Sequence, residues 1–162
     1  MTDFGRLLAA LTNTGVEFIV IGGFAATAHG SAHVTVDLDI VYARTMPNMQ
    51  RLSTALAPLQ PYLRGAPPGL PFQFDPDTIS RGLNFTLTTT AGDLDVLGEA
   101  TGGGTYDLLL TQSEIRQLLG LECRFVNLET LIRLKRAAGR PKDFERIAEL
   151  ELLWKEKLSG VD

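Results

Sequence analysis

The stretch from Ile19 to Tyr42, IVIGGFAATAHGSAHVTVDLDIVY, decides the fold of this chain. It opens with an apolar run that is typical of a buried strand. Gly22 and Gly23 then predict a tight turn into a short, alanine-rich helix. The run from Val34 to Tyr42 predicts a second strand. The stretch therefore predicts a strand–turn–helix–strand unit.

The second strand carries two carboxylates on one face. Asp37 and Asp39 are separated by one residue, and side chains alternate along a strand, so both point the same way. Like charges this close repel, and a chain tolerates them either in open water or around a cation. A metal site is one interpretation; a pair at an exposed strand end, beside a plain glycine turn, is the other.

Periodicity predicts the remaining elements. We expect helices at residues 3–14, 24–29, 47–59, 128–138 and 141–158, and strands at 16–21, 34–42, 83–89, 93–97 and 121–126. Residues 114–119 fit either a strand paired with 121–126 or a short helix. On the last helix, we expect one buried stripe, formed by Phe144, Ile147, Leu150, Trp154 and Leu158.

Six of the eight prolines fall between Pro58 and Pro76, which predicts a long loop that is either a functional lid or disordered. The order of the elements predicts a single α+β domain over residues 1–162. We expect a mixed β-sheet packed against helices on one side, with the carboxylates at the sheet edge and the C-terminal helices closing a cleft over them.

Composition narrows the class of protein. The chain has 162 residues, a net charge of −4 and one cysteine, so it has no internal disulfide framework. No signal peptide and no membrane-spanning apolar run are visible, so we expect a cytoplasmic protein with no membrane partner. The acidic balance argues mildly against a large RNA partner.

One segment has the opposite charge. Residues 124–146 contain seven basic and three acidic side chains. This segment could face the carboxylates across a cleft and keeps RNA possible as a partner. A solvated helical surface is the alternative.

Three short motifs appear in a defined order along the chain. They are Ile21-Gly22-Gly23, Asp37-Leu38-Asp39-Ile40 and Leu94-Asp95-Val96. Together they resemble the signature of the nucleotidyltransferase superfamily with the DNA polymerase beta fold. Asp93 shares the strand face of Asp95 and is the second choice for the third carboxylate.

The resemblance extends to a narrower group. The stretch from Gly22 to Tyr42 and the segment from Leu131 to Leu150 are similar to the minimal nucleotidyltransferases of bacterial toxin–antitoxin modules and to AbiEii-like proteins. The chain departs from them at His33 and Val36, where such proteins often carry Arg and Lys. The resemblance implies a nucleotidyltransferase fold and the possibility of a partner antitoxin protein.

The resemblance also implies a metal-dependent transfer of NMP from an NTP such as ATP to a hydroxyl. Magnesium prefers carboxylate oxygens, and two ions about 4 Å apart can serve both the attacking and the leaving oxygen. Asp37 and Asp39 would bind both Mg²⁺ ions, and Asp95 would complete one of them. Gly22 and Gly23 would let the triphosphate approach the backbone N–H groups. The hydroxyl acceptor could belong to a protein, an RNA or a small molecule.

Two residues near the C-terminus are further candidates for the nucleotide site. Lys135 lies on the apolar stripe of its helix, where an ammonium is costly unless it reaches water or an anion. We expect it to reach the nucleotide or a carboxylate; snorkelling to solvent is the alternative. Asp143 could simply complement the dipole of the last helix, but the resemblance makes it a site candidate.

Two other classes of function compete with the transferase. One is a non-catalytic nucleotide-binding or interaction protein of a toxin–antitoxin pair, which would not need all three carboxylates. The other is a metal-dependent nuclease, against which the glycine turn argues because it favours triphosphate binding.

Overall fold

The two strands of the quoted stretch lie near the middle of a seven-stranded mixed sheet. The computed structural model describes residues 1–160, so the last two residues of the predicted domain, 161 and 162, lie outside the described part. Strand β1 (Phe18–Ile21) pairs antiparallel with β2 (Asp37–Tyr42). The order across the sheet is β3-β4-β5-β2-β1-β9-β8, with β2 parallel to β5 and β1 parallel to β9. The predicted α+β class with a mixed sheet is confirmed.

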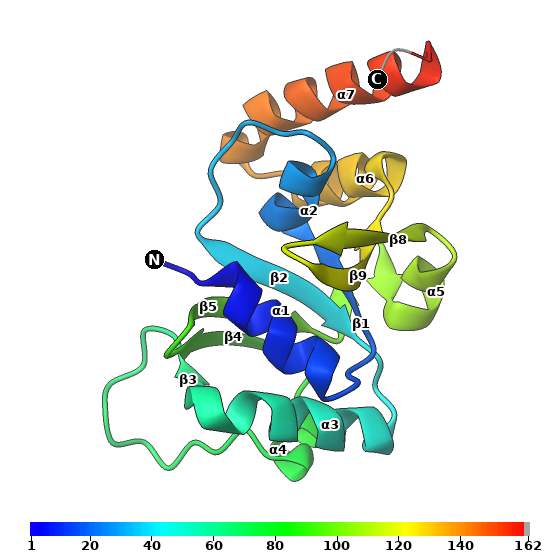
Figure 1. Ribbon diagram of the computed structural model, residues 1–162. Coiled ribbons are helices and arrows are strands. Elements are labelled where there is room, and N and C mark those ends of the chain that lie inside the picture. Colours follow the sequence, from blue (N-terminus) through cyan, green and yellow to red (C-terminus); the bar gives the residue numbers. More distant parts are fainter. Residues whose placement is uncertain (161–162) are drawn as a thin grey trace.

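The other elements surround this pair of strands (Figure 1). The remaining strands are β3 (Tyr62–Leu63), β4 (Asn84–Thr89), β5 (Gly92–Leu97), β6 (Glu99–Ala100), β7 (Gly104–Thr105), β8 (Ser113–Leu118) and β9 (Leu121–Val126). The helices are α1 (Phe4–Asn13), α2 (Gly22–Ala28), α3 (Met46–Leu56), α4 (Pro76–Arg81), α5 (Tyr106–Leu110), α6 (Leu128–Ala138) and α7 (Phe144–Leu158), with short 3-10 turns at Ala57–Leu59 and Pro141–Asp143. Residues 114–118 are therefore in a strand, and the helix alternative is wrong.

Local sequence sets the bounds of several elements. All four residues of β1 are buried, as its unbroken apolar run predicts. Helix α6 has the bounds predicted for it, because the Asn127 side chain accepts a hydrogen bond from Thr130 N at its start. Gly139 ends the helix in the left-handed conformation at φ 63°.

The second strand is shorter than predicted. It starts at Asp37, and the side chains of Val34 and Val36 are 81% and 70% exposed. The preceding segment is held by α7 instead of by a neighbouring strand. Ala32 N donates to the Glu149 carboxylate at 3.0 Å, and His33 Nδ1 lies 2.9 Å from the same group. The apolar residues before Asp37 therefore belong to a connecting loop.

The predicted buried stripe of the last helix is only partly correct. Ile147 and Leu150 are buried, whereas Phe144 and Leu158 are 63% and 70% exposed. The C-terminal end of α7 projects away from the other elements, as Figure 1 shows at the top of the molecule. Hydrophobic periodicity predicts which face is apolar, but it does not predict how much of that face another element covers.

The proline-rich segment is more ordered than a long loop. It contains β3, which pairs with β4, and its end starts α4 at Pro76. Tyr62 packs edge-on against Phe72 with ring centroids 6.2 Å apart, and Phe74 packs against Phe85 at 5.4 Å. Aromatic contacts thus anchor the segment to the sheet. Over residues 1–160, no helix has the length and apolar character that crossing a membrane requires.

Candidate active site

The three predicted carboxylates meet on one face of the sheet. Asp37 and Asp39 lie on β2 and Asp95 lies on β5, the parallel neighbour of β2. The register places Asp39 opposite Asp95, so residues far apart in the sequence become adjacent. One carboxylate oxygen from each of the three residues lies within 4.8 Å of the other two. This spacing is compatible with shared ligation of a cation.

Asp93, the second choice for the third carboxylate, is placed differently. It lies opposite Asp37 in the register. The cluster of mutually close ligand atoms contains Asp95 and not Asp93 among residues 1–160. Asp93 lies 3.5 Å from Nε of Arg64. The geometry therefore favours Asp95 as the third ligand.

The glycine pair leaves room for the carboxylates. Gly22 has φ +67°, and a Cβ atom there would overlap Oδ2 of Asp39 and lie 2.9 Å from its Cγ. A Cβ atom at Gly23 would lie 2.6 Å from Oγ1 of Thr35. Since real Cβ atoms do not approach other atoms this closely, the glycines are required by the close approach of the neighbouring strand and loop. Their predicted contact with a triphosphate stays a prediction.

A cavity of about 440 Å³ opens over the acidic cluster. Its walls include Gly22 and Gly23 and the three carboxylates. Four basic side chains from the C-terminal segment also line it: Lys135, Arg140, Lys142 and Arg146. Part of the positively charged segment seen in the sequence thus faces the carboxylates across one cavity. Such a cavity can hold a ligand that carries several negative charges together with cations.

The carboxylates repel one another and are partly withdrawn from water. Burial, the contact with the Asp95 carboxyl and the charge of Asp37 raise the pKa of Asp39 to about 8, and Lys135 opposes this shift. Burial and the charge of Asp95 also raise the pKa of Asp37. Without a cation in the cluster, these groups therefore retain protons more strongly than carboxyls in water.

Lys135 lines the cavity, and its predicted contact with a nucleotide or a carboxylate stays a prediction. It is 6% exposed, and desolvation lowers its pKa although the charges of Asp143 and Asp39 oppose this. The ammonium therefore reaches the cavity from a largely buried helix face.

Asp143 occupies a different position from Lys135. It is fully buried and does not line the cavity. Its Oδ2 accepts a hydrogen bond from Arg140 Nε at 2.8 Å. Asp143 thus orients a cavity-lining arginine, and its direct contact with a nucleotide stays a prediction.

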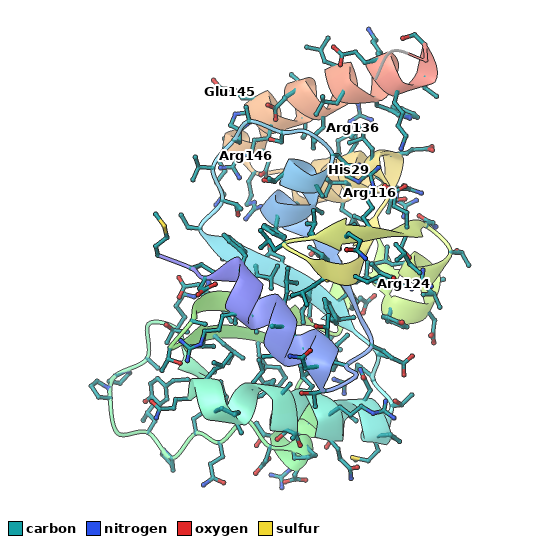
Figure 2. The ribbon with its side chains drawn as sticks, viewed as in Figure 1. His29, Arg116, Arg124, Arg136, Glu145 and Arg146 are labelled. Atoms are coloured by element: carbon teal, nitrogen blue, oxygen red, sulfur yellow. The ribbon has the colours of Figure 1, made fainter. Side chains whose placement is uncertain are left out.

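Arg146 joins the cavity to the loop before β2. It lies near the start of α7, beside α2 and that loop, as Figure 2 shows. Arg140, Lys142 and Arg146 were not among the predicted site residues. The only signal that pointed to them was the positive charge of residues 124–146. Similar proteins often carry Arg and Lys where this chain has His33 and Val36. In this chain, the three basic residues of the cavity wall supply positive charge instead.

Arg64 also belongs to the site, and sequence reasoning missed it. Its guanidinium contacts three carboxylates: Asp95 at 3.0 Å, Asp93 at 3.5 Å and Asp37 at 4.0 Å. It follows β3 in the proline-rich segment, where it is the single basic residue between Pro58 and Pro76. Its isolated positive charge in that segment was the feature of the sequence that could have pointed to it.

The cluster fits a divalent cation by its chemistry. Three carboxylates offer the hard oxygen ligands that Mg²⁺ prefers. Oδ1 of Asp95 is buried and, within the described residues, makes no aligned hydrogen bond. This oxygen lies 3.0 Å from Nη2 of Arg64, so the guanidinium and a metal ion are alternative partners for it. Asp37, Asp39 and Asp95 could therefore hold a metal ion.

Among the comparisons with known proteins, only the one with solved structures found a match, and that match concerns the fold. No protein-family model matches the chain, and no curated protein matches its sequence. Among solved structures, a protein from Thermotoga maritima described as a "putative nucleotidyltransferase" superposes with a TM-score of 0.51 and 12% identity. The match covers 95% of this chain and 89% of that one. The chain therefore has the mixed α+β fold of that nucleotidyltransferase-like structure.

Proposed function

We propose that this protein is a metal-dependent nucleotidyltransferase that moves NMP from an NTP to a hydroxyl acceptor. One observation carries the proposal: a single cavity holds three clustered carboxylates, while four basic side chains line the same cavity. The fold shared with the Thermotoga maritima protein supports the same class. A site that only bound an anion would not need the carboxylates.

The donor set supports Mg²⁺ as the metal. Asp37 and Asp39 would hold an ion, and a second ion would need Asp95 as well. The bound metal supplies positive charge that stabilises the phosphate oxygens as charge develops on them. The basic residues that line the cavity bind the triphosphate, with Lys135 and Arg146 among them. Gly22 and Gly23 line the same cavity and would let the triphosphate approach their backbone N–H groups.

The reaction forms one bond and breaks another. The acceptor's hydroxyl oxygen bonds to the α-phosphorus, while the bond from that phosphorus to the bridging oxygen breaks. Pyrophosphate leaves with the electron pair. The carboxylate of Asp95 would accept the hydroxyl proton. The acceptor belongs to a protein, an RNA or a small molecule, and a toxin–antitoxin partner is part of this proposal through the sequence resemblance.

Radiolabelled nucleotides test this proposal directly. The protein is incubated with each α-labelled NTP, Mg²⁺ and cell extract, and label transfer and pyrophosphate release are measured together. We expect both signals from the wild type and neither from Asp37→Asn. Asp77→Asn is the matched control, because Asp77 is an exposed carboxylate paired with Arg81 outside the cavity. Equal activity of the wild type and Asp37→Asn, or no transfer with any NTP, would refute the proposal.

A further inference from the structure

The position of Arg64 follows from the pairing of four neighbouring strands. Backbone N of Arg64 donates to Thr86 O at 3.0 Å, which places it beside β4. Thr86 faces Asp95 on β5, and β5 pairs in turn with β2. Arg64 therefore approaches the carboxylates across β4, and Figure 1 shows β3 on the opposite side of β2 from α6 and α7.

The guanidinium is fixed by the sheet as well as by charge. Its Nη2 donates to Leu87 O at 2.6 Å, and the side chain is 27% exposed. A hydrogen bond to a backbone carbonyl fixes an arginine more firmly than an exposed ion pair does. Arg64 is thus a built-in cation at this edge of the cluster.

Arg64 lies at different distances from the three carboxylates of the cluster. It lies 3.0 Å from Oδ1 of Asp95 and 4.0 Å from Oδ2 of Asp37, while its ion pairs do not include Asp39. Both Nε of Arg64 and Oδ1 of Asp95 are buried without an aligned hydrogen bond in the described part of the chain. The contact is therefore one of charge and proximity, with Asp95 turned toward the guanidinium.

We propose that the guanidinium of Arg64 takes the place of the second divalent cation at Asp95. The free protein then binds one divalent ion, through Asp37 and Asp39, where two were expected from the sequence. Two cations beside the same carboxylate oxygen repel each other strongly at these distances. Arg64 is a positioning residue in this scheme, because it supplies a permanent charge next to Asp95. The inference rests on the metal site of the proposed function.

Manganese titration counts the ions without any nucleotide. Free Mn²⁺ is measured by electron paramagnetic resonance at increasing total Mn²⁺, with isothermal titration as a second readout. We expect one bound Mn²⁺ in the wild type and two in Arg64→Gln. Any residual binding of a second ion to the wild type should be about tenfold or more weaker than the second site of Arg64→Gln. Arg64→Lys keeps the charge and should bind one.

Arg81→Gln is the matched control for net charge. Arg81 pairs with Asp77 on the surface, 77% exposed, so its loss should leave one bound ion. Circular dichroism and the melting temperature establish that each variant is folded. Two ions in the wild type, or one in folded Arg64→Gln, would overturn the inference.

A second variant tests the inference should Arg64→Gln fail to fold. If Arg64 occupies Asp95, the ion in the free protein does not need Asp95 as a ligand. Asp95→Asn should therefore still bind one Mn²⁺, with its affinity changed less than about threefold. Loss of that ion in Asp95→Asn, or no ion in the wild type, would overturn the inference. Label transfer decides separately on the proposed function, since the titration contains no NTP.

Discussion

The substitution Gly22→Ala tests the construction of the site most directly. Gly22 has φ +67°, and an added Cβ would overlap Oδ2 of Asp39. Two effects should therefore act together. The backbone must hold an L-residue in the left-handed region, and the carboxylate of Asp39 must move away from its position beside Gly22.

A matched control separates these two effects. Gly120 has φ +78°, and no atom lies within 4 Å of the position of its Cβ. Gly120→Ala should therefore lower the free energy of unfolding by only the backbone cost, about 1–2 kcal/mol. Gly22→Ala adds the cost of displacing a packed neighbour, about 1–3 kcal/mol. We expect a total loss of about 2–5 kcal/mol for Gly22→Ala.

Urea unfolding followed by circular dichroism measures both losses, and Mn²⁺ titration measures the metal site. Gly22→Ala should weaken Mn²⁺ binding by about tenfold or more, because one ligand is displaced. Gly120→Ala should bind Mn²⁺ as the wild type does. Equal losses of stability in the two variants, together with unchanged Mn²⁺ affinity in Gly22→Ala, would refute the reasoning.

Three further predictions concern the carboxylates and the basic wall of the cavity. Because the pKa of Asp39 is raised from 3.8 to about 8, the metal-free protein should lose stability as pH rises through that range. Melting temperatures in EDTA should show a smaller slope for Asp39→Asn, and equal slopes would contradict the assignment. Lys135→Met should raise the melting temperature, because it removes a desolvated ammonium, while it weakens binding of a fluorescent ATP analogue. Unchanged analogue binding would remove Lys135 from the nucleotide site. Asp143→Ala should lower the free energy of unfolding by about 1.5–3 kcal/mol through loss of a buried charged hydrogen bond. Asp143→Ala should also weaken binding of the ATP analogue, because it releases Arg140. Arg140→Ala should weaken analogue binding as well, and it should cost at least as much stability, because it leaves the buried carboxylate of Asp143 without its partner. Intact analogue binding in both variants would show that this pair does not serve the ligand.

The sequence alone was sufficient for the features that depend on near neighbours. Alternation placed Asp37 and Asp39 on one strand face, and the glycine pair marked the start of α2. Asn127 and Gly139 are enough to start and end α6. These are local effects, because a cap, a turn or a strand face depends on residues a few positions apart. The three motifs together also predicted the class of fold.

The local sequence pattern gave wrong predictions of burial where segments far away in the chain decide which side chains are covered. Val34 and Val36 have strand-like side chains, but Glu149 of α7 holds the loop before them. Phe144 continues the apolar stripe of α7, but it is 63% exposed. A pattern of apolar residues states a preference for burial, and only the packed chain shows which residues are covered.

Asp95 shows which features of the site follow from the sequence and which follow from the tertiary structure. Its motif identified it as a candidate, but its neighbours depend on the parallel register of β2 and β5, which places it opposite Asp39. The same strand order brings Arg64 across β4 to within 3.0 Å of it. The sequence by itself determined the carboxylates and the elements that carry them. The tertiary structure alone decided their distances, the basic side chains facing them and the arginine beside them, because these come from pairing and packing between segments far apart in the chain.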